Sequence, residues 1–179
     1  MSAQSRSKEL IRLTYCSTAT FAESNQSAGI EKEVARILMQ SRRNNPKREL
    51  GGVLHYGNGY FFQTLEGQRD NVNERYEKIV TDPRHRDVEL LSVQRVSDRL
   101  FPDWSMKYVA VESQIREMLE KNGMKEFQPY GFDEAFCERL IRCFVEQRDA
   151  TREPRRQPGN RKPDLPPQKR SIWQRLFGG

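Results

Sequence analysis

Residues 51–67 read GGVLHYGNGYFFQTLEG and indicate two short strands joined by a tight turn. Residues 57–59 (GNG) separate two runs rich in aromatic and β-branched residues, which is typical of a β-hairpin. Alternate residues of a strand share a face, so Phe61, Gln63 and Leu65 point to the same side. That face is apolar except for Gln63, and an unpaired buried amide costs roughly 1–3 kcal/mol. The sequence therefore predicts a polar partner for Gln63.

Strand and helix patterns extend outward from this hairpin in both directions. Apolar residues repeat at every second position in the predicted strands and at every third or fourth position in the predicted helices. In chain order we expect a strand at 10–18, a helix at 29–43, the two hairpin strands, a helix at 69–82, a strand at 87–97 and a fifth strand at 104–112. The order β-α-β-β-α-β plus a fifth strand indicates a ferredoxin-like fold of the α+β class. Both helices should then lie on one face of a mostly antiparallel sheet.

Two C-terminal helices are expected to cover the other face of the sheet. They are predicted at residues 113–123 and 133–149, and the second carries Phe136, Leu140 and Phe144 at four-residue steps. That spacing produces an apolar stripe along one side of a helix.

The composition changes near Thr151. Five of the nine prolines fall between residues 154 and 167, among many charged residues, which predicts a disordered Pro/Arg-rich tail. The tail ends in a short amphipathic stretch, SIWQRLFGG at 171–179. This stretch could bind a membrane surface, a protein or nucleic acid. The simpler interpretation is an unstructured end that only increases solubility.

The charge is concentrated in this tail. The net charge is +6, but residues 152–179 hold eight Lys or Arg and two Asp or Glu, which leaves 23 of each sign in residues 1–151. A neutral body does not indicate binding to DNA or RNA over the whole domain. No apolar run approaches the ~20 residues that span a membrane, and the first ten residues lack the apolar core of a signal peptide, so we expect a cytoplasmic protein. Three cysteines without metal-binding spacing, and two histidines, predict no metal site.

Several polar side chains lie on predicted apolar strand faces or at element ends. Tyr15 and Gln63 could satisfy each other as a buried pair, and that purely structural reading remains open. Trp104 and Met106 should share one face of the fifth strand, where core packing would also explain them. Asn44 and Asn45 follow a predicted helix and could be simple capping or turn residues, and Arg84 and His85 could belong to a solvated turn.

The chain resembles the BLUF domains, which are blue-light sensors that use FAD. The matching pieces are LTYCS at 13–17, NNPKRELGGVLHY at 44–56, FFQTLEG at 61–67, DPRHRDV at 82–88 and FPDWSMKYV at 101–109. Each piece is weak alone, but all five occur in order and on the expected elements. The loop at 17–29 is longer than is usual for the family, although it removes no motif residue.

The resemblance implies a noncovalently bound FAD between the two helices, with FMN or riboflavin as possible substitutes. By resemblance, Asn45 would bind the polar edge of the flavin ring, with Asn44 nearby, and Arg84 and His85 would hold the ring end or the ribityl chain. Ile37, Leu54 and Phe61 would line the apolar part of the pocket. The sequence has no Gly-rich dinucleotide motif, so the phosphates are expected to be loosely held.

The resemblance also implies a mechanism. Blue light would excite the flavin, Tyr15 would donate an electron and a proton, and the Gln63 amide would rotate or tautomerise. Trp104 or Met106 would lie beside Gln63 and pass the change to the fifth strand and the C-terminal helices.

The predicted organisation is a photosensor domain at 9–110, a helical output or cap region at 111–150 and the tail at 151–179. We expect a short non-enzymatic photoreceptor that forms homo-oligomers and signals to a partner protein. The alternatives are an RNA-binding or protein-interaction module on a ferredoxin-like fold; a hydrolase lacks a nucleophile–His–acid set.

Overall fold

A computed structural model describes residues 9–21, 32–109 and 113–151. In chain order its elements are β1 Leu10–Ala19, α1 Lys32–Asn44, η1 Pro46–Arg48, β2 Gly51–Gly57, β3 Tyr60–Gln68, α2 Arg69–Val80, β4 His85–Arg95, β5 Lys107–Tyr108, α3 Ser113–Lys121, η2 Pro129–Gly131 and α4 Glu134–Thr151. The sheet has the order β4-β1-β3-β2-β5, in which β5 runs parallel to β2 and the other neighbours are antiparallel. The predicted fold class and element order are confirmed.

The hairpin between β2 and β3 turns through Asn58 and Gly59. Both residues have positive φ angles, 53° and 76°, as the two central residues of a type I′ turn require. Asn and Gly adopt this conformation at low cost, so the turn fixes the register in which Leu54 lies opposite Gln63.

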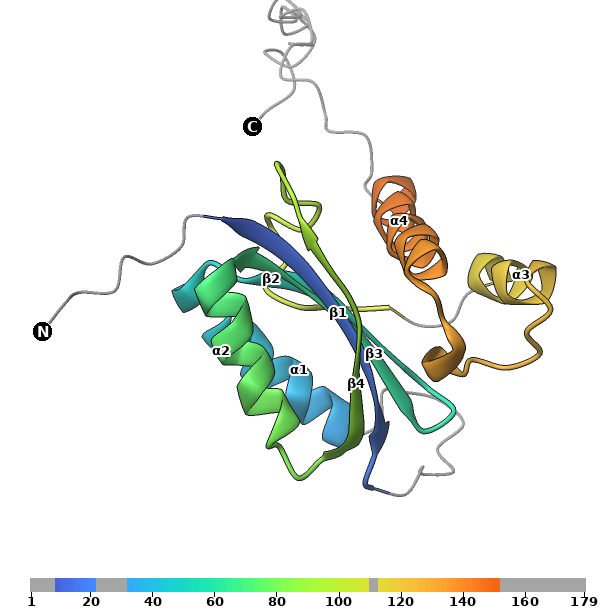
Figure 1. Cartoon of the computed structure of the whole chain (residues 1–179), viewed down its shortest axis with the longest axis horizontal. Helices are drawn as coiled ribbons and strands as arrows, with labels where there is room; N and C mark the ends of the chain where they lie inside the picture. The colour runs from blue at the N-terminus through green and yellow to red at the C-terminus, as the bar shows by residue number, and fades with distance from the viewer. Residues whose placement is uncertain (1–8, 22–31, 110–112, 152–179) are drawn as a thin grey trace, which may run out of the picture.

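One face of the sheet is covered by α1 and α2 (Figure 1). The core between them contains Tyr15 from β1, Phe61 and Leu65 from β3, and apolar residues of both helices. The alternation predicted for β3 is therefore confirmed, and Gln63 lies between the two apolar side chains of this face.

The opposite face is covered by η2 and α4, with α3 beside α4 (Figure 1). Phe62 of β3 packs there against Phe132 and Phe144, at centroid distances of 6.1 and 6.2 Å. The prediction that two C-terminal helices close the sheet is confirmed, because α3 and α4 supply the apolar residues of this second core.

The fifth strand is shorter than predicted. Only Lys107 and Tyr108 pair with β2, whereas residues 101–106 follow an irregular path and residues 110–112 lie outside the described ranges. The predicted domain boundary near residue 110 falls at this gap and stays a prediction. Thr151, the first residue of the predicted tail, ends α4, and residues 152–179 lie outside the described ranges. Within the described ranges, no helix has the length and apolar character that crossing a bilayer requires.

Candidate functional site

Tyr15 and Gln63 are directly opposite each other on β1 and β3. The Tyr15 hydroxyl donates a hydrogen bond to Gln63 Oε1, and both side chains are buried. Gln63 Nε2 donates in turn to the sulfur of Met106 at 3.2 Å. The polar partner predicted for Gln63 is therefore Tyr15, and the amide is satisfied at both ends.

Met106, and not Trp104, lies beside Gln63. Met106 belongs to the core under α1 and α2, whereas Trp104 packs with the core under α4 and stacks on Phe101 at 5.3 Å. The prediction that Trp104 and Met106 share a face is wrong, because residues 101–106 are not a strand and the two-residue alternation does not apply to them.

The environment of Tyr15 disfavours the phenolate. Burial raises the pKa of Tyr15 well above its ordinary value, while the nearby Arg75 guanidinium acts in the opposite direction. The Tyr76 ring lies 5.5 Å from the Tyr15 ring. Loss of a proton alone is therefore costly at Tyr15, and loss of a proton together with an electron avoids leaving a buried anion.

The two asparagines after α1 have different environments. Asn44 is exposed, whereas Asn45 is fully buried and its Nδ2 donates to the Ser105 carbonyl at 2.5 Å. Asn45 Oδ1 is buried without a hydrogen-bond partner among the described residues. Buried amide oxygens are normally satisfied, so this atom is ready to accept from an N–H or O–H group.

A cavity of about 320 Å³ opens between the end of α1 and α2. It is lined by Asn44, Asn45, Lys47, Arg48, Arg75 and Lys78. Arg75 is largely withdrawn from water, which lowers its pKa, and its Nη2 donates to Ser41 Oγ at 3.3 Å. The cavity is thus lined by two amides and four cationic side chains, of which Arg48 and Lys78 are ion-paired with Glu74, and such a lining suits a ligand with negative charge.

The predicted apolar residues belong to the same core as Tyr15. Ile37 comes from α1, Leu54 from β2 and Phe61 from β3, and all three are buried between the sheet and the two helices. They would present an apolar wall to a planar ring.

His85 and Arg84 diverge at the start of β4. His85 is buried, its Nδ1 lies 2.8 Å from Ser17 Oγ, and its ring is 4.5 Å from Phe61. Burial lowers the pKa of His85 to about 4, so the imidazole is neutral at pH 7. The Arg84 guanidinium is half-buried and is held by Asp82 at 2.5 Å and by Gln40 at 2.8 Å.

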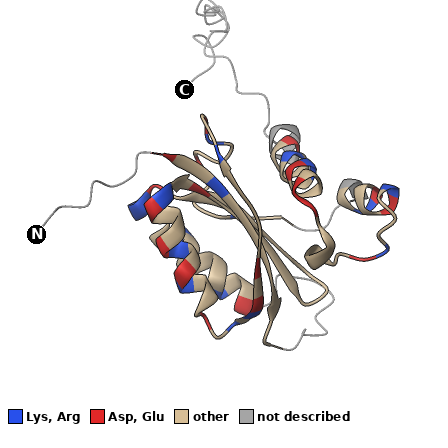
Figure 2. Ribbon diagram, in the orientation of Figure 1, with Lys and Arg blue, Asp and Glu red and all other residues tan. Residues whose placement is uncertain are grey.

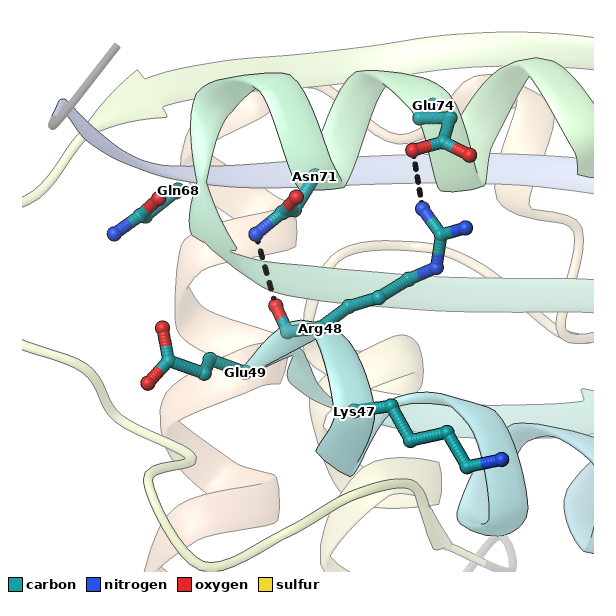
Figure 3. A pocket seen from close by; sticks show the side chains of 6 residues that line it. All are labelled: Lys47, Arg48, Glu49, Gln68, Asn71 and Glu74. Carbon is teal, nitrogen blue, oxygen red and sulfur yellow. Dashed lines mark hydrogen bonds and ion pairs between the residues drawn. The ribbon is translucent and has the colours of Figure 1, made fainter. Parts of the chain in front are cut away.

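A larger surface pocket of about 800 Å³ lies where η1 meets the start of α2 (Figure 3). Its lining residues are polar, and they include Asn71, which donates to the Arg48 carbonyl at 3.0 Å, and the ion pair between Arg48 and Glu74. These contacts attach η1 to α2. None of the predicted site residues lines this pocket, so we do not place the ligand there.

Sequence reasoning missed Arg75, Lys78 and Ser41. A usable signal existed for Arg75, which lies three positions after Val72 and four before Ile79, within the apolar stripe of α2. A cation at a position that should be buried indicates a ligand or a hydrogen-bonding partner.

Comparisons with known proteins identify the family of this chain. A family model described as "Sensors of blue-light using FAD" matches residues 10–107, more than half of the chain. The photoactivated adenylate cyclase subunit beta of Euglena longa is 36% identical over 98 residues, which are 54% of this chain and 11% of that protein. The chain thus spans about a tenth of the length of this curated relative.

Solved structures are similar over more of the chain. The ground state of BlsA superposes with a TM-score of 0.69 at 27% identity, over 76% of this chain and 87% of that one. The dark state of BlrB, a BLUF protein, superposes with a TM-score of 0.63 at 28% identity, over 78% of this chain and 98% of that one. The chain belongs to the BLUF family, the sensors of blue light that use FAD.

Proposed function

We propose that this chain is a photoreceptor that binds FAD noncovalently between the sheet and the helices α1 and α2. The residues fit such a ligand. Asn45 Oδ1, which has no hydrogen-bond partner within the described part of the chain, can accept from the ring N–H, and Ile37, Leu54 and Phe61 can contact the apolar part of the ring. Arg75 and Lys47 of the cavity can face the phosphates.

When bound, the flavin supplies absorption of blue light and an excited state that accepts an electron. Tyr15 is the proposed donor, because its hydroxyl already points at an acceptor, Gln63 Oε1. Its proton moves to that oxygen as its electron leaves, and both return when the charges recombine. Tyr15 is thus restored, and the amide is the group that can end in a new orientation.

Gln63 has two possible orientations with different partners. In the observed one, Oε1 accepts from Tyr15 and Nε2 donates to the Met106 sulfur. After rotation, Nε2 would face the Tyr15 hydroxyl, which can also accept, while Oε1 would face a thioether, which has no proton to donate. The rotated amide cannot keep its bond to Met106, so the 101–106 segment loses this one contact in one of the two states.

The contact sequence Tyr15–Gln63–Met106 is the observation that carries this proposal. It joins a redox-active phenol to a segment that leads to β5 and then to α3 and α4. We propose that the output is a change in these helices, read by a partner protein or by a second copy of the chain. The cyclase relative matches over 98 residues, 11% of its length, and we propose a sensor role for this chain.

The RNA-binding alternative is disfavoured. Phe61 and Phe62 are fully buried beneath helices on the two faces of the sheet, whereas base stacking needs exposed rings. Figure 2 also shows acidic and basic residues interspersed on the described helices.

The purified protein tests the proposal directly. It should be yellow, its flavin absorption should shift to the red under blue light, and the shift should reverse in darkness. Chromatography of the released pigment identifies FAD, FMN or riboflavin. Gln63→Leu should retain the pigment and lose the shift; a colourless wild-type protein, or a shift that persists in this variant, would refute the proposal.

A further inference from the structure

A second polar pair joins the same two strands on the other face of the sheet. Arg12 and Glu66 are directly opposite each other on β1 and β3, three residues along from Tyr15 and Gln63. An odd offset reverses the side-chain direction, so this pair faces α4 while Tyr15 and Gln63 face α1 and α2. Both charged side chains are buried.

The two oxygens of Glu66 bind different parts of the molecule. Oε1 accepts from Arg12 Nε at 2.7 Å, and Oε2 accepts from the backbone N–H of Phe101 at 2.9 Å. Arg12 also forms an ion pair with Glu138 on α4, with 3.4 Å between Arg12 Nη1 and the carboxylate oxygen. One carboxylate therefore contacts the start of the segment that leads to Met106 and, through Arg12, the last helix.

Besides the bond to Glu66, the 101–106 segment is attached through its backbone carbonyls, and Phe101 and Met106 are buried in the two cores. The Trp104 carbonyl accepts a hydrogen bond from the Gly52 backbone N–H. The Ser105 carbonyl accepts from Asn45 Nδ2, and the Met106 carbonyl accepts from Arg42 Nε. These bonds attach an irregular segment to β2 and α1, and not to a long strand ladder.

Gly51 allows the segment to approach the sheet closely. A Cβ at Gly51 would overlap the carbonyl oxygen of Phe101, so only glycine permits this path. Phe101 is therefore seated directly above β2, next to the Glu66 that binds its N–H. Met106 follows Phe101 closely in the sequence, so a displacement of Met106 can be transmitted along the backbone to Phe101.

We propose that Glu66 is a positioning residue that couples the Met106 segment to α4 through Arg12 and Glu138. The inference rests on the proposed function, because it needs Gln63 to release Met106 in light. When the segment moves, the Phe101 N–H leaves Glu66 Oε2, and the carboxylate and Arg12 readjust together. The bond between Arg12 and Glu138 weakens, and α4 is less tightly held on the sheet. Buried ion networks are sensitive in this way, because a buried charge that loses a partner is costly.

Hydrogen exchange of α4 in darkness and under blue light tests the coupling in the full-length, flavin-loaded protein. In the wild type, exchange of the amides at 136–144 should be faster in light than in darkness. Glu138→Gln should keep the red shift but abolish this difference, with dark exchange raised to the level of the illuminated wild type. Glu134→Gln is the matched control on the same helix: Glu134 accepts from Gln94 at 3.1 Å on the surface and should leave the light response of α4 unchanged.

Each outcome is decisive. If Glu138 were merely structural, exchange in Glu138→Gln would rise equally in both states and the light–dark difference would remain, which overturns the inference. A wild type that shifts to the red without any change in α4 exchange also overturns it and leaves photosensing intact. Absence of the red shift in the wild type refutes the proposed photosensor function, and it also refutes the proposed coupling, which depends on that function.

Discussion

Met106 lies in contact with Gln63, with its sulfur accepting a hydrogen bond from Gln63 Nε2 at 3.2 Å. This bond favours one orientation of the amide, because a thioether accepts hydrogen bonds and cannot donate them. We expect Met106→Leu to remove that preference while preserving the packed volume. A hydrogen bond of this kind contributes about 0.5–1.5 kcal/mol, so the balance between the two orientations should change by up to roughly tenfold.

The measurement is the rate of dark recovery after a blue pulse, followed by flavin absorption. Met106→Leu should recover several-fold more slowly than the wild type, because the observed orientation is less favoured. Trp104→Phe is the comparison, since Trp104 packs in the opposite core and stacks on Phe101. Equal effects of the two substitutions would contradict the assignment of Met106 as the neighbour of Gln63.

Tyr15→Phe should bind flavin normally and show no red-shifted state. The ring that packs in the core is retained, but the hydroxyl that donates to Gln63 is lost. Absorption spectra before and during illumination give the answer. Tyr76→Phe is the control, because the Tyr76 ring lies 5.5 Å from Tyr15 and should keep the photocycle. A normal light-induced shift in Tyr15→Phe would exclude Tyr15 as the donor.

The regular strands explain how far the sequence could predict the site. Alternation along β1 and β3 correctly placed Tyr15 and Gln63 on one face, because both strands are continuous and their register is fixed by the hairpin and the core. The same rule failed at Trp104 and Met106, where the chain follows side-chain hydrogen bonds in place of a ladder. No local pattern encodes such contacts, because the donors are about 60 residues away in sequence.

The cationic side of the cavity was missed for a related reason. Arg75 and Lys78 belong to α2, whereas Asn44 and Asn45 follow α1, and only the packing of the two helices brings them together. The amphipathic pattern predicted α2 correctly, and Val72 and Ile79 of its apolar stripe are buried, although Val80 in the same stripe is exposed. It could not indicate that a charged residue in that face lines a cavity shared with another helix.

Arg75→Gln should weaken FAD binding more than riboflavin binding. The cation lines the cavity and is bonded to the neutral Ser41 hydroxyl, so it is available to a phosphate, which riboflavin lacks. Titration of apoprotein with each flavin, followed by fluorescence quenching, should show roughly a tenfold loss for FAD, which corresponds to about 1.4 kcal/mol. Arg43→Gln, on the exposed side of α1, should have no such effect. An equal loss for both flavins would place Arg75 against the ring and refute the phosphate assignment.

The burial of His55 beneath α4 predicts how the free energy of unfolding depends on pH. Its Nδ1 lies 2.6 Å from the Val109 carbonyl, which can only accept, so Nδ1 carries the proton of the neutral ring. Nε2 is buried without a hydrogen-bond partner among the described residues, and the centroid of the Phe127 ring lies 4.4 Å from that of the His55 ring. Burial lowers the pKa of His55 to about 4. Protonation would place an unpaired charge in this core.

The sign follows from proton linkage. Between about pH 4 and pH 6.5 the unfolded chain binds a proton at His55 and the folded chain does not, so the free energy of unfolding falls as the pH falls. The loss from this residue approaches about 3 kcal/mol at pH 4. His85, whose pKa is also lowered to about 4, adds a similar slope.

Urea unfolding of the wild type and His55→Gln at pH 7, 6, 5 and 4.5 separates these contributions. Glutamine can still donate to Val109 but does not titrate, so the variant should lose part of the acid sensitivity that the wild type shows below pH 6.5. Carboxylates and His85 contribute equally to both proteins, so the difference between the two curves belongs to His55. Parallel curves over this range would mean that the folded protein accommodates a charged His55, and burial beneath α4 would not keep the imidazole neutral.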